Sequence, residues 1–107
     1  LTRVWGQNYE IAWRDYVYEV FRDQDGKSAV RQRLLALELS RREGTVSKAD
    51  LAGLSPQLAQ LYAQKTPKTL ARDLHALLKR NLVILDQGAY RAYKEIMLSF
   101  RPLTKAR

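Results

Sequence analysis

Residues 66–93 read TPKTLARDLHALLKRNLVILDQGAYRAY, and the period of their apolar residues changes halfway along. In the second half, residues 82–86 and 89–94 read as two short strands around Gln87-Gly88, a pair of residues typical of a tight hairpin turn. In the first half, at about 100° per residue, one helix face collects Leu70, Ala71, Leu74, Leu77 and Leu78. The stretch therefore predicts a helix followed at once by a hairpin.

A shorter helix is expected just before this one. Ser55-Pro56 and Thr66-Pro67 each pair a capping hydroxyl with a proline whose missing N–H costs nothing in the first helical turn. We therefore predict helices over 56–64 and 67–80. Two helices joined by a few residues and followed by a hairpin make a helix-turn-helix with a wing.

An aromatic helix is expected near the start of the chain. Asn8 can cap a helix that runs to about Arg22, and Asp-Gln-Asp-Gly at 23–26 ends it. Ile11, Tyr18 and Phe21 lie partly outside its apolar face and offer a surface to a second copy of the chain, or to an upstream domain. The apolar face itself consists of Tyr9, Trp13, Tyr16, Val17 and Val20.

Two more helices complete the expected architecture. Ser28 starts one that ends near Gly44, and Ser47 and Asp50 have the spacing of a capping box for a short helix carrying Leu51. The inward residues of the first are Val30, Leu34, Leu35 and Leu37. The predicted fold is mainly α with a small β-hairpin wing, a winged helix-turn-helix preceded by an N-terminal helix. Residues 1–26 form the aromatic helix and turn, 27–102 the winged helix-turn-helix domain and 103–107 a basic tail.

The composition fits one small globular domain. The chain has 107 residues, of which 46% are hydrophobic and 28% charged. It has no cysteine, which excludes a disulfide framework and fits the reducing cytoplasm where we expect it. Its longest aliphatic run, 82–85, is far too short to span a membrane, so we expect no membrane partner. The chain begins with Leu1 rather than methionine, and we expect it to be part of a longer protein.

The net charge of +8 is unevenly distributed. Residues 1–26 hold three basic and five acidic side chains, whereas residues 27–107 hold 16 basic and six acidic ones. Clustered Lys and Arg attract nucleic acid because they release counterions from its phosphates. The charges alone are equally consistent with a solvated surface that keeps a small domain in solution.

Double-stranded DNA is the partner predicted from the position of these charges. The helix over 67–80 would be the recognition helix, since the N–H groups and dipole at its start favour phosphate. Arg72 is best suited to read a guanine edge, and the lysines suit phosphate. The predicted DNA-binding residues are Lys65, Thr66, Lys68, Thr69, Arg72 and Lys79, with Arg91 and Lys94 on the wing.

Some of these residues have a simpler interpretation. Thr66 and Thr69 are more typical of helix caps than of base contacts, and the wing tyrosines of packing than of base stacking. Asp73 argues against dense DNA contact unless Arg72 or Arg80 pairs with it.

The central residues also resemble a known pattern. Thr69-Leu70-Ala71-Arg72-Asp73-Leu74, Leu77 and Asn81-Leu82-Val83 resemble the T-x-x-R-D-L-x-x-L-x-x-x-G-L-V pattern of winged helices in transcription regulators. They are similar, more closely, to the domain that follows the catalytic module in many Fic-family proteins, whose wing reads G-x-Y-R-A and ends near an apolar-x-F-x-P segment. The matching residues here are Gly88-Ala89-Tyr90-Arg91-Ala92 and Leu98-Ser99-Phe100-Arg101-Pro102. The resemblance covers residues 45–102 and departs at Asn81, where glycine is usual; asparagine tolerates the left-handed conformation next best.

This resemblance implies a regulatory DNA-binding module. It is also compatible with the module being the C-terminal part of a Fic-type enzyme. The catalytic signature of that family, H-P-F-x-x-G-N-G-R, is absent. His75, the one histidine, lies mid-helix with no cysteine or second histidine to complete a metal site, so we expect a packed or half-exposed helix residue. No nucleophile motif or glycine-rich phosphate loop is present, so we predict no catalysis, metal or cofactor.

Two other functions remain open at this stage. A winged helix can dock on a parent enzyme domain or another protein partner without binding DNA, and the fold alone does not decide between these roles. RNA binding is a third interpretation, for which the sequence offers basic residues but no aromatic platform of known type.

Overall fold

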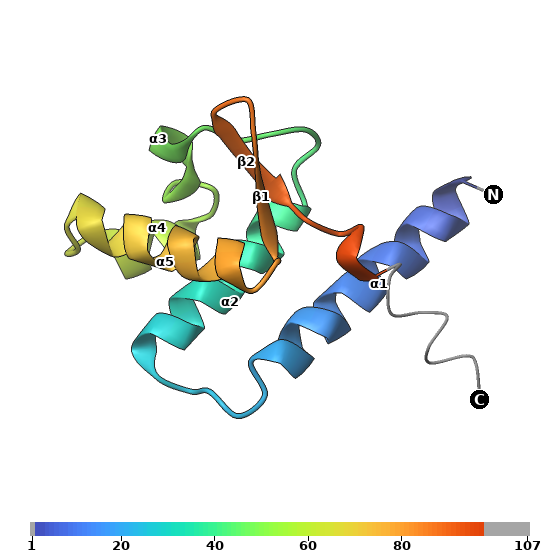
Figure 1. The fold of residues 1–107 in the computed structure, drawn as a ribbon, viewed down its shortest axis with the longest axis horizontal. Coiled ribbons are helices and arrows are strands. Elements are labelled where there is room, and N and C mark those ends of the chain that lie inside the picture. Colours follow the sequence, from blue (N-terminus) through green and yellow to red (C-terminus); the bar gives the residue numbers. More distant parts are fainter. Residues whose placement is uncertain (1, 98–107) are drawn as a thin grey trace.

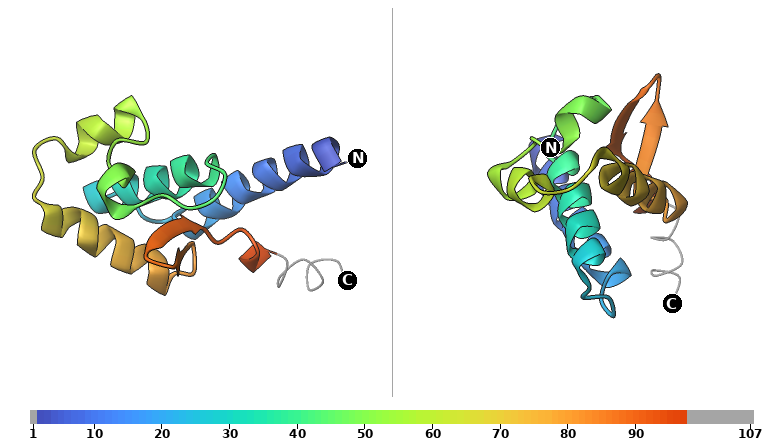
Figure 2. Two further views of the ribbon diagram at one scale, coloured as in Figure 1. Left: turned by 90° about the horizontal axis from the view of Figure 1, so that it is seen from above. Right: turned by 90° about the vertical axis from the view of Figure 1, so that its left-hand side faces the viewer.

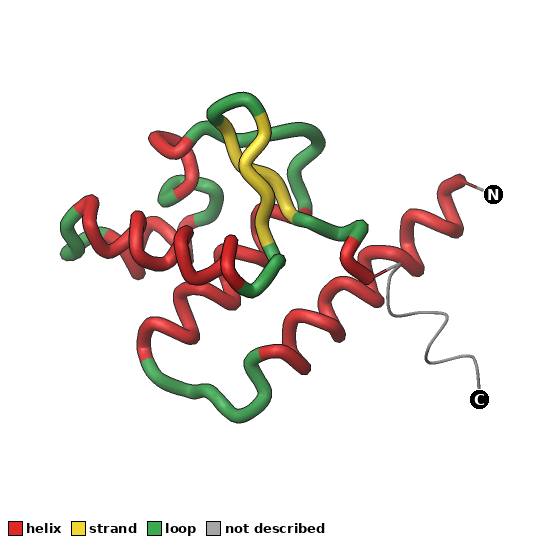
Figure 3. The backbone as a smooth tube through the Cα atoms, viewed as in Figure 1, coloured by secondary structure: helices red, strands yellow, loops and turns green. Residues whose placement is uncertain are grey.

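The computed structural model describes the backbone of residues 2–97 and the side chains of residues 10–97. Three predictions fall outside this part of the chain: the apolar contact of the Tyr9 side chain, the segment 98–102 and the basic tail 103–107. The elements follow in the order α1 (Thr2–Val20), α2 (Lys27–Ser40), α3 (Lys48–Leu51), α4 (Pro56–Tyr62), α5 (Pro67–Lys79), β1 (Val83–Asp86) and β2 (Ala89–Ala92). The fold is mainly helical with a small hairpin after the helices, as predicted (Figures 1 and 3).

Helix α2 lies at the centre of the molecule. It packs against α1 and against α5, and it also contacts α4 and β2. The hairpin and α5 lie on the same side of α2, as the two views in Figure 2 show. Because it has neighbours on several sides, α2 buries the small residues Ala29 and Ala36 as well as Leu35 and Leu39. Of the residues predicted to face inward, only Leu35 lies on this buried face, and Val30, Leu34 and Leu37 are half-buried.

The buried core joins all these elements. Helix α1 contributes Trp13 and Val17, and Phe21 follows directly after its last residue. The indole N–H of Trp13 donates to the carbonyl of Ala36 at 3.4 Å. Outside α2, the rest of the core comes from α3, α4, α5, the hairpin and the residues on either side of it: Leu51, Leu58, Tyr62, Leu74, Leu77, Leu82, Val83, Ala92 and Met97. The predicted leucine face of α5 thus supplies the centre of the core, with Leu70 and Leu78 packed at its edge.

Two predictions about α1 were wrong. The helix begins at Thr2, so Asn8 lies inside it and does not cap it. An asparagine inside a helix lowers helix stability by less than about 1 kcal/mol relative to alanine, which is too little to set a helix boundary by itself. Phe21, placed partly outside the apolar face, is fully buried, and the guanidinium of Arg80 lies 4.7 Å from its ring centre.

Helix α2 is shorter than predicted at its C-terminus. It starts at Lys27, one residue before Ser28, but ends at Ser40 instead of near Gly44. Gly44 has a φ of +77°, and this conformation belongs to the loop after the helix. The loop is needed because Val46 and Tyr90 exchange two backbone hydrogen bonds of 2.7 and 2.8 Å, so the chain has to leave α2 early enough to reach the hairpin.

The predicted capping residues precede their helices, but only one of the three forms the expected hydrogen bond. The hydroxyl of Ser55 accepts from the backbone N–H of Leu58 at 3.2 Å, as expected for the start of α4. Ser47 and Thr66 also precede their helices, yet neither side chain caps a backbone N–H. The Ser47 hydroxyl instead donates to the Asp50 carboxylate at 3.1 Å, so the capping box is not formed.

The hairpin has the predicted two-residue turn. Its strands pair antiparallel from Val83 opposite Ala92 to Asp86 opposite Ala89, which makes each strand slightly shorter than predicted. Gln87 and Gly88 both have positive φ, 53° and 83°, as the tight turn requires. The N–H of Leu82 donates to the carbonyl of Leu77 at 3.0 Å, which joins the hairpin directly to the end of α5.

Asn81 connects α5 to the hairpin in the left-handed conformation, with a φ of 62°. Replacing Asn81 with alanine is expected to lower the free energy of unfolding by about 1 kcal/mol, because a Cβ without a polar group is strained there. Asn81→Gly should leave the free energy within about 0.5 kcal/mol of the wild type. Urea unfolding of both variants tests this, and equal losses would show that the conformation of Asn81 does not limit stability.

Candidate nucleic-acid interface

The outward face of α5 carries a row of basic side chains. Lys68, Arg72, His75 and Lys79 fall at i, i+4, i+7 and i+11, so they lie on one side of the helix, opposite the leucine face. All four are exposed. We call this set the basic ridge. The structure thus brings together three of the predicted DNA-binding residues and adds His75, which had been expected to be packed or half-exposed.

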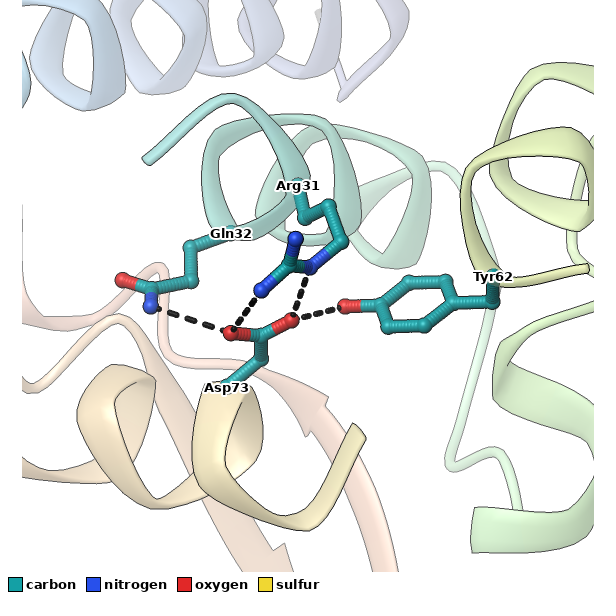
Figure 4. Close-up of polar contacts among 4 residues, drawn as sticks. All are labelled: Arg31, Gln32, Tyr62 and Asp73. Carbon is teal, nitrogen blue, oxygen red and sulfur yellow. Dashed lines mark hydrogen bonds and ion pairs between the residues drawn. The ribbon is translucent and has the colours of Figure 1, made fainter. Parts of the chain in front are cut away.

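The only carboxylate of α5 points the other way. Asp73 is 2% exposed and lies where α5 meets α2 and α4. Its Oδ2 accepts from Nε of Arg31 at 2.8 Å, and its Oδ1 accepts from the side-chain amide of Gln32 at 3.1 Å. The hydroxyl of Tyr62 also donates to Oδ2 (Figure 4). No acidic group therefore interrupts the basic ridge, and the objection that Asp73 raised against phosphate contact does not hold.

Neither of the two arginines considered as partners of Asp73 pairs with it. Arg72 points to the surface, and Arg80 bonds the side chain of Gln24 at 2.7 Å and covers Phe21. The partner is Arg31, from the helix at the centre of the fold. Arg31 could not be chosen from the sequence because it lies 42 residues away, but the burial of Asp73 has a signal. At helical spacing Asp73 falls beside Leu70 and Leu77, nearer the core than the surface.

The charges in this network support one another. The hydrogen bond from Arg31 to Asp73 holds the pKa of the guanidinium above its ordinary value. Burial raises the pKa of the Tyr62 phenol, and its hydrogen bond to Asp73 and the charge of that carboxylate raise it further. Arg31 and Tyr62 thus remain hydrogen-bond donors to Asp73 throughout the neutral pH range. The four residues tie α2, α4 and α5 together at one point.

The turn between α4 and α5 adds one more cation near the ridge. Lys65 and Thr66 are both exposed, and the backbone N–H of Lys65 donates to the carbonyl of Tyr62 at 3.1 Å. Thr69 is half-buried, and its N–H bonds the carbonyl of Thr66 at 3.0 Å. Lys65 and Thr66 therefore lie at the N-terminal end of α5, where its dipole favours an anion, whereas Thr69 is less accessible.

The hairpin is less basic than predicted. The guanidinium of Arg91 lies 3.1 Å from the Glu95 carboxylate and 3.9 Å from that of Asp86. Lys94 is half-buried. Partial burial opposes ionisation of Glu95, but the hydrogen bond and charge of Arg91 outweigh it and lower the pKa of Glu95. Two carboxylates thus balance the two predicted wing cations, so the structure concentrates positive charge on α5 and not on the wing.

Neither a metal-binding cluster nor a membrane-spanning helix is found in the described part of the chain. Within residues 2–97, no three His, Cys, Asp or Glu side chains lie close enough to hold a metal ion, and no helix is long and apolar enough to cross a membrane. No protein-family model matches the chain, and neither a curated protein nor a solved structure shows significant similarity to it. Interpretation of the basic ridge therefore depends on its own geometry.

Asp73→Asn is expected to be strongly destabilising. The amide keeps the shape of the carboxylate but leaves the charge of Arg31, whose side chain is only 12% exposed, without its partner. Breaking a buried ion pair in this way costs on the order of 3–5 kcal/mol. Asp50→Asn, at an exposed position, is the matched control and should change stability by less than about 0.5 kcal/mol. Chemical unfolding measures both, and equal effects would refute a structural role for Asp73.

Tyr62→Phe should reveal the raised pKa of Tyr62 through the pH dependence of stability. The unfolded phenol ionises near its ordinary pKa of about 10, whereas the folded one stays protonated to higher pH, so the unfolded state binds fewer protons above that value. The stabilisation is fully present below about pH 10 and is lost as the pH rises beyond it. Unfolding measured from about pH 8 to pH 11 should show the advantage of wild type over Tyr62→Phe shrinking at the alkaline end. A constant difference would contradict the shift.

Proposed function

We propose that this chain is a winged-helix module that binds double-stranded DNA through the basic ridge of α5. The main observation in support of this proposal is the orientation of the charged side chains on that helix. Those that are exposed are all basic, because Asp73 is turned into the core. A polyanion therefore meets an uninterrupted row of donors, and a helix of this size fits a major groove.

Individual residues contribute in different ways under this proposal. Arg72, in the middle of the ridge, can donate two parallel hydrogen bonds to a guanine edge, while Lys68 and Lys79 pair with phosphates on either side. Lys65 and Thr66 support phosphate binding at the start of α5. The hairpin contributes shape more than charge, since Arg91 is held by Asp86 and Glu95.

The resemblance of residues 45–102 to the winged helix of Fic-family proteins supports a regulatory role. In such an arrangement the chain is the C-terminal part of an enzyme and directs it to DNA or reports DNA binding to it. The chain itself supplies no catalytic group in this proposal.

Protein docking is the second candidate function. The observation that favours it is the hairpin, which has little net charge and exposes Leu85 near its turn. A wing of this kind is better suited to an apolar contact with a parent enzyme domain or another protein than to contact with a phosphate backbone. In that case the basic ridge is a solvated surface.

The salt dependence of DNA binding tests the proposal. If Lys65, Lys68, Arg72 and Lys79 engage phosphates or bases and Lys94 adds to them, log K should fall with log salt at a slope of about −4. Lys79→Ala should flatten this slope by about one for every DNA sequence, whereas Arg72→Ala should cost on the order of 1–3 kcal/mol only at a preferred site.

Lys27→Ala is the matched control, because Lys27 is also an exposed lysine but begins α2 and lies outside the ridge. It should change the slope by much less than Lys79→Ala does. Fluorescence anisotropy with a short duplex, starting at about 50 mM salt, measures all four proteins. Absence of binding by the wild type, or equal effects of the two lysine variants, would eliminate DNA binding through α5 and favour docking.

A further inference from the structure

Helix α1 carries a second stripe that the rest of the fold does not bury. Among the described side chains, three large hydrophobic residues are exposed: Ile11 at 51%, Tyr18 at 48% and Leu85 at 52%. Two of these lie on α1, seven residues apart. Together with Arg14 and Asp15 they occupy positions i, i+3, i+4 and i+7, which place them on one side of the helix, away from Trp13 and Val17.

A groove borders this stripe. It has a volume of about 460 Å³ and runs between α1 and α2, where Ile11, Arg14 and Tyr18 face Leu34 and Leu37. The guanidinium of Arg33 lies 5.3 Å from the Tyr18 ring centre and holds that side chain in place. The first turns of α1 project beyond the end of α2 (Figures 1 and 2). The exposure of Ile11 and Tyr18 leaves the stripe itself accessible to a second helix.

We infer that the stripe Ile11-Arg14-Asp15-Tyr18 pairs with the same stripe of a second copy of this chain. The two α1 helices run antiparallel about a two-fold axis that passes between residues 14 and 15. In this register Ile11 of one copy packs on Tyr18 of the other, and Arg14 of one copy meets Asp15 of the other. Each contact occurs twice, because the two-fold axis repeats it.

The charges on the stripe identify a second copy as its partner. A surface that binds itself about a two-fold axis has to be its own complement, and this stripe has an apolar residue at each end and opposite charges in the middle. A polyanion gains little here, because Asp15 balances Arg14 and residues 1–26 carry an excess of acidic side chains. The pairing needs no residue of α5, so it does not depend on DNA binding.

The expected association is weak and depends on protein concentration. The stripe offers two apolar residues per copy, and its groove adds only the half-buried Leu34 and Leu37. A standard stable interface buries about 1,600 Å², which a single pair of helices of this length does not reach without neighbouring contacts. A dissociation constant of about 10 to 100 μM is consistent with such an interface.

Charge exchange at the centre of the stripe gives a sharp test. Sedimentation velocity of the full chain, without DNA and from about 5 to 500 μM, should show a monomer–dimer equilibrium. Arg14→Asp and Asp15→Arg should each weaken self-association at least about tenfold, since each creates two like-charge contacts per dimer. An equimolar mixture of the two variants should associate again, because the acidic stripe of one then meets the basic stripe of the other.

Paired apolar substitutions supply the control. Ile11→Ser should weaken the dimer at least about tenfold, whereas Leu85→Ser, at an equally exposed hairpin position, should leave it unchanged. Circular dichroism confirms that each variant is folded. A wild type that stays monomeric throughout, a mixture that associates no better than either charge variant alone, or equal effects of Ile11→Ser and Leu85→Ser would overturn the inference.

Discussion

The buried carboxylate of Asp73 joins three helices at one point and fixes α5 in the rotation that its leucine face also requires. It receives hydrogen bonds from Arg31 and Gln32 of α2 and from Tyr62 of α4, so three helices meet at one side chain. A buried charge is stable only when it is paired and its remaining oxygen lone pairs are satisfied, which restricts α5 to one rotation about its own axis. That rotation places the leucines inward and leaves Lys68, Arg72, His75 and Lys79 outside.

Local patterns predicted much of this architecture. The apolar spacing of residues 70–78 located α5, and Ser55-Pro56, Thr66-Pro67 and Gln87-Gly88 marked helix starts and the hairpin turn correctly. These features depend on residues within a few positions of one another. The partner of Asp73, the bridge between Val46 and Tyr90 and the burial of Phe21 depend on contacts between distant parts of the chain. A single sequence carries no local signal for them. The error at Gly44 arose because the bridge from Val46 to Tyr90 outweighs a weak cap preference, and the error at Asn8 because one asparagine costs too little to set a helix boundary.

The same distinction between local patterns and distant contacts explains why only part of the candidate site could be predicted. Helical spacing was enough to place Lys68, Arg72 and Lys79 on one exposed face, since that depends on α5 alone. The wing residues could not be judged from spacing, because Asp86 and Glu95 reach Arg91 only once the hairpin and the turn after it have formed. The result is a molecule with a basic face on one helix and a mixed apolar and charged stripe on another, which separates the proposed DNA contact from the proposed self-association.

Chemical-shift mapping with ¹⁵N-labelled protein and a short DNA duplex tests the central claim most directly, because it locates the contact without substituting any residue. The account predicts that the largest shifts fall on the backbone amides of residues 65–79, with smaller ones in the hairpin and little change in α1. Shifts confined to α1 and the groove beside it, or no shifts at low salt, would contradict the claim that burial of Asp73 leaves α5 as a DNA-binding surface.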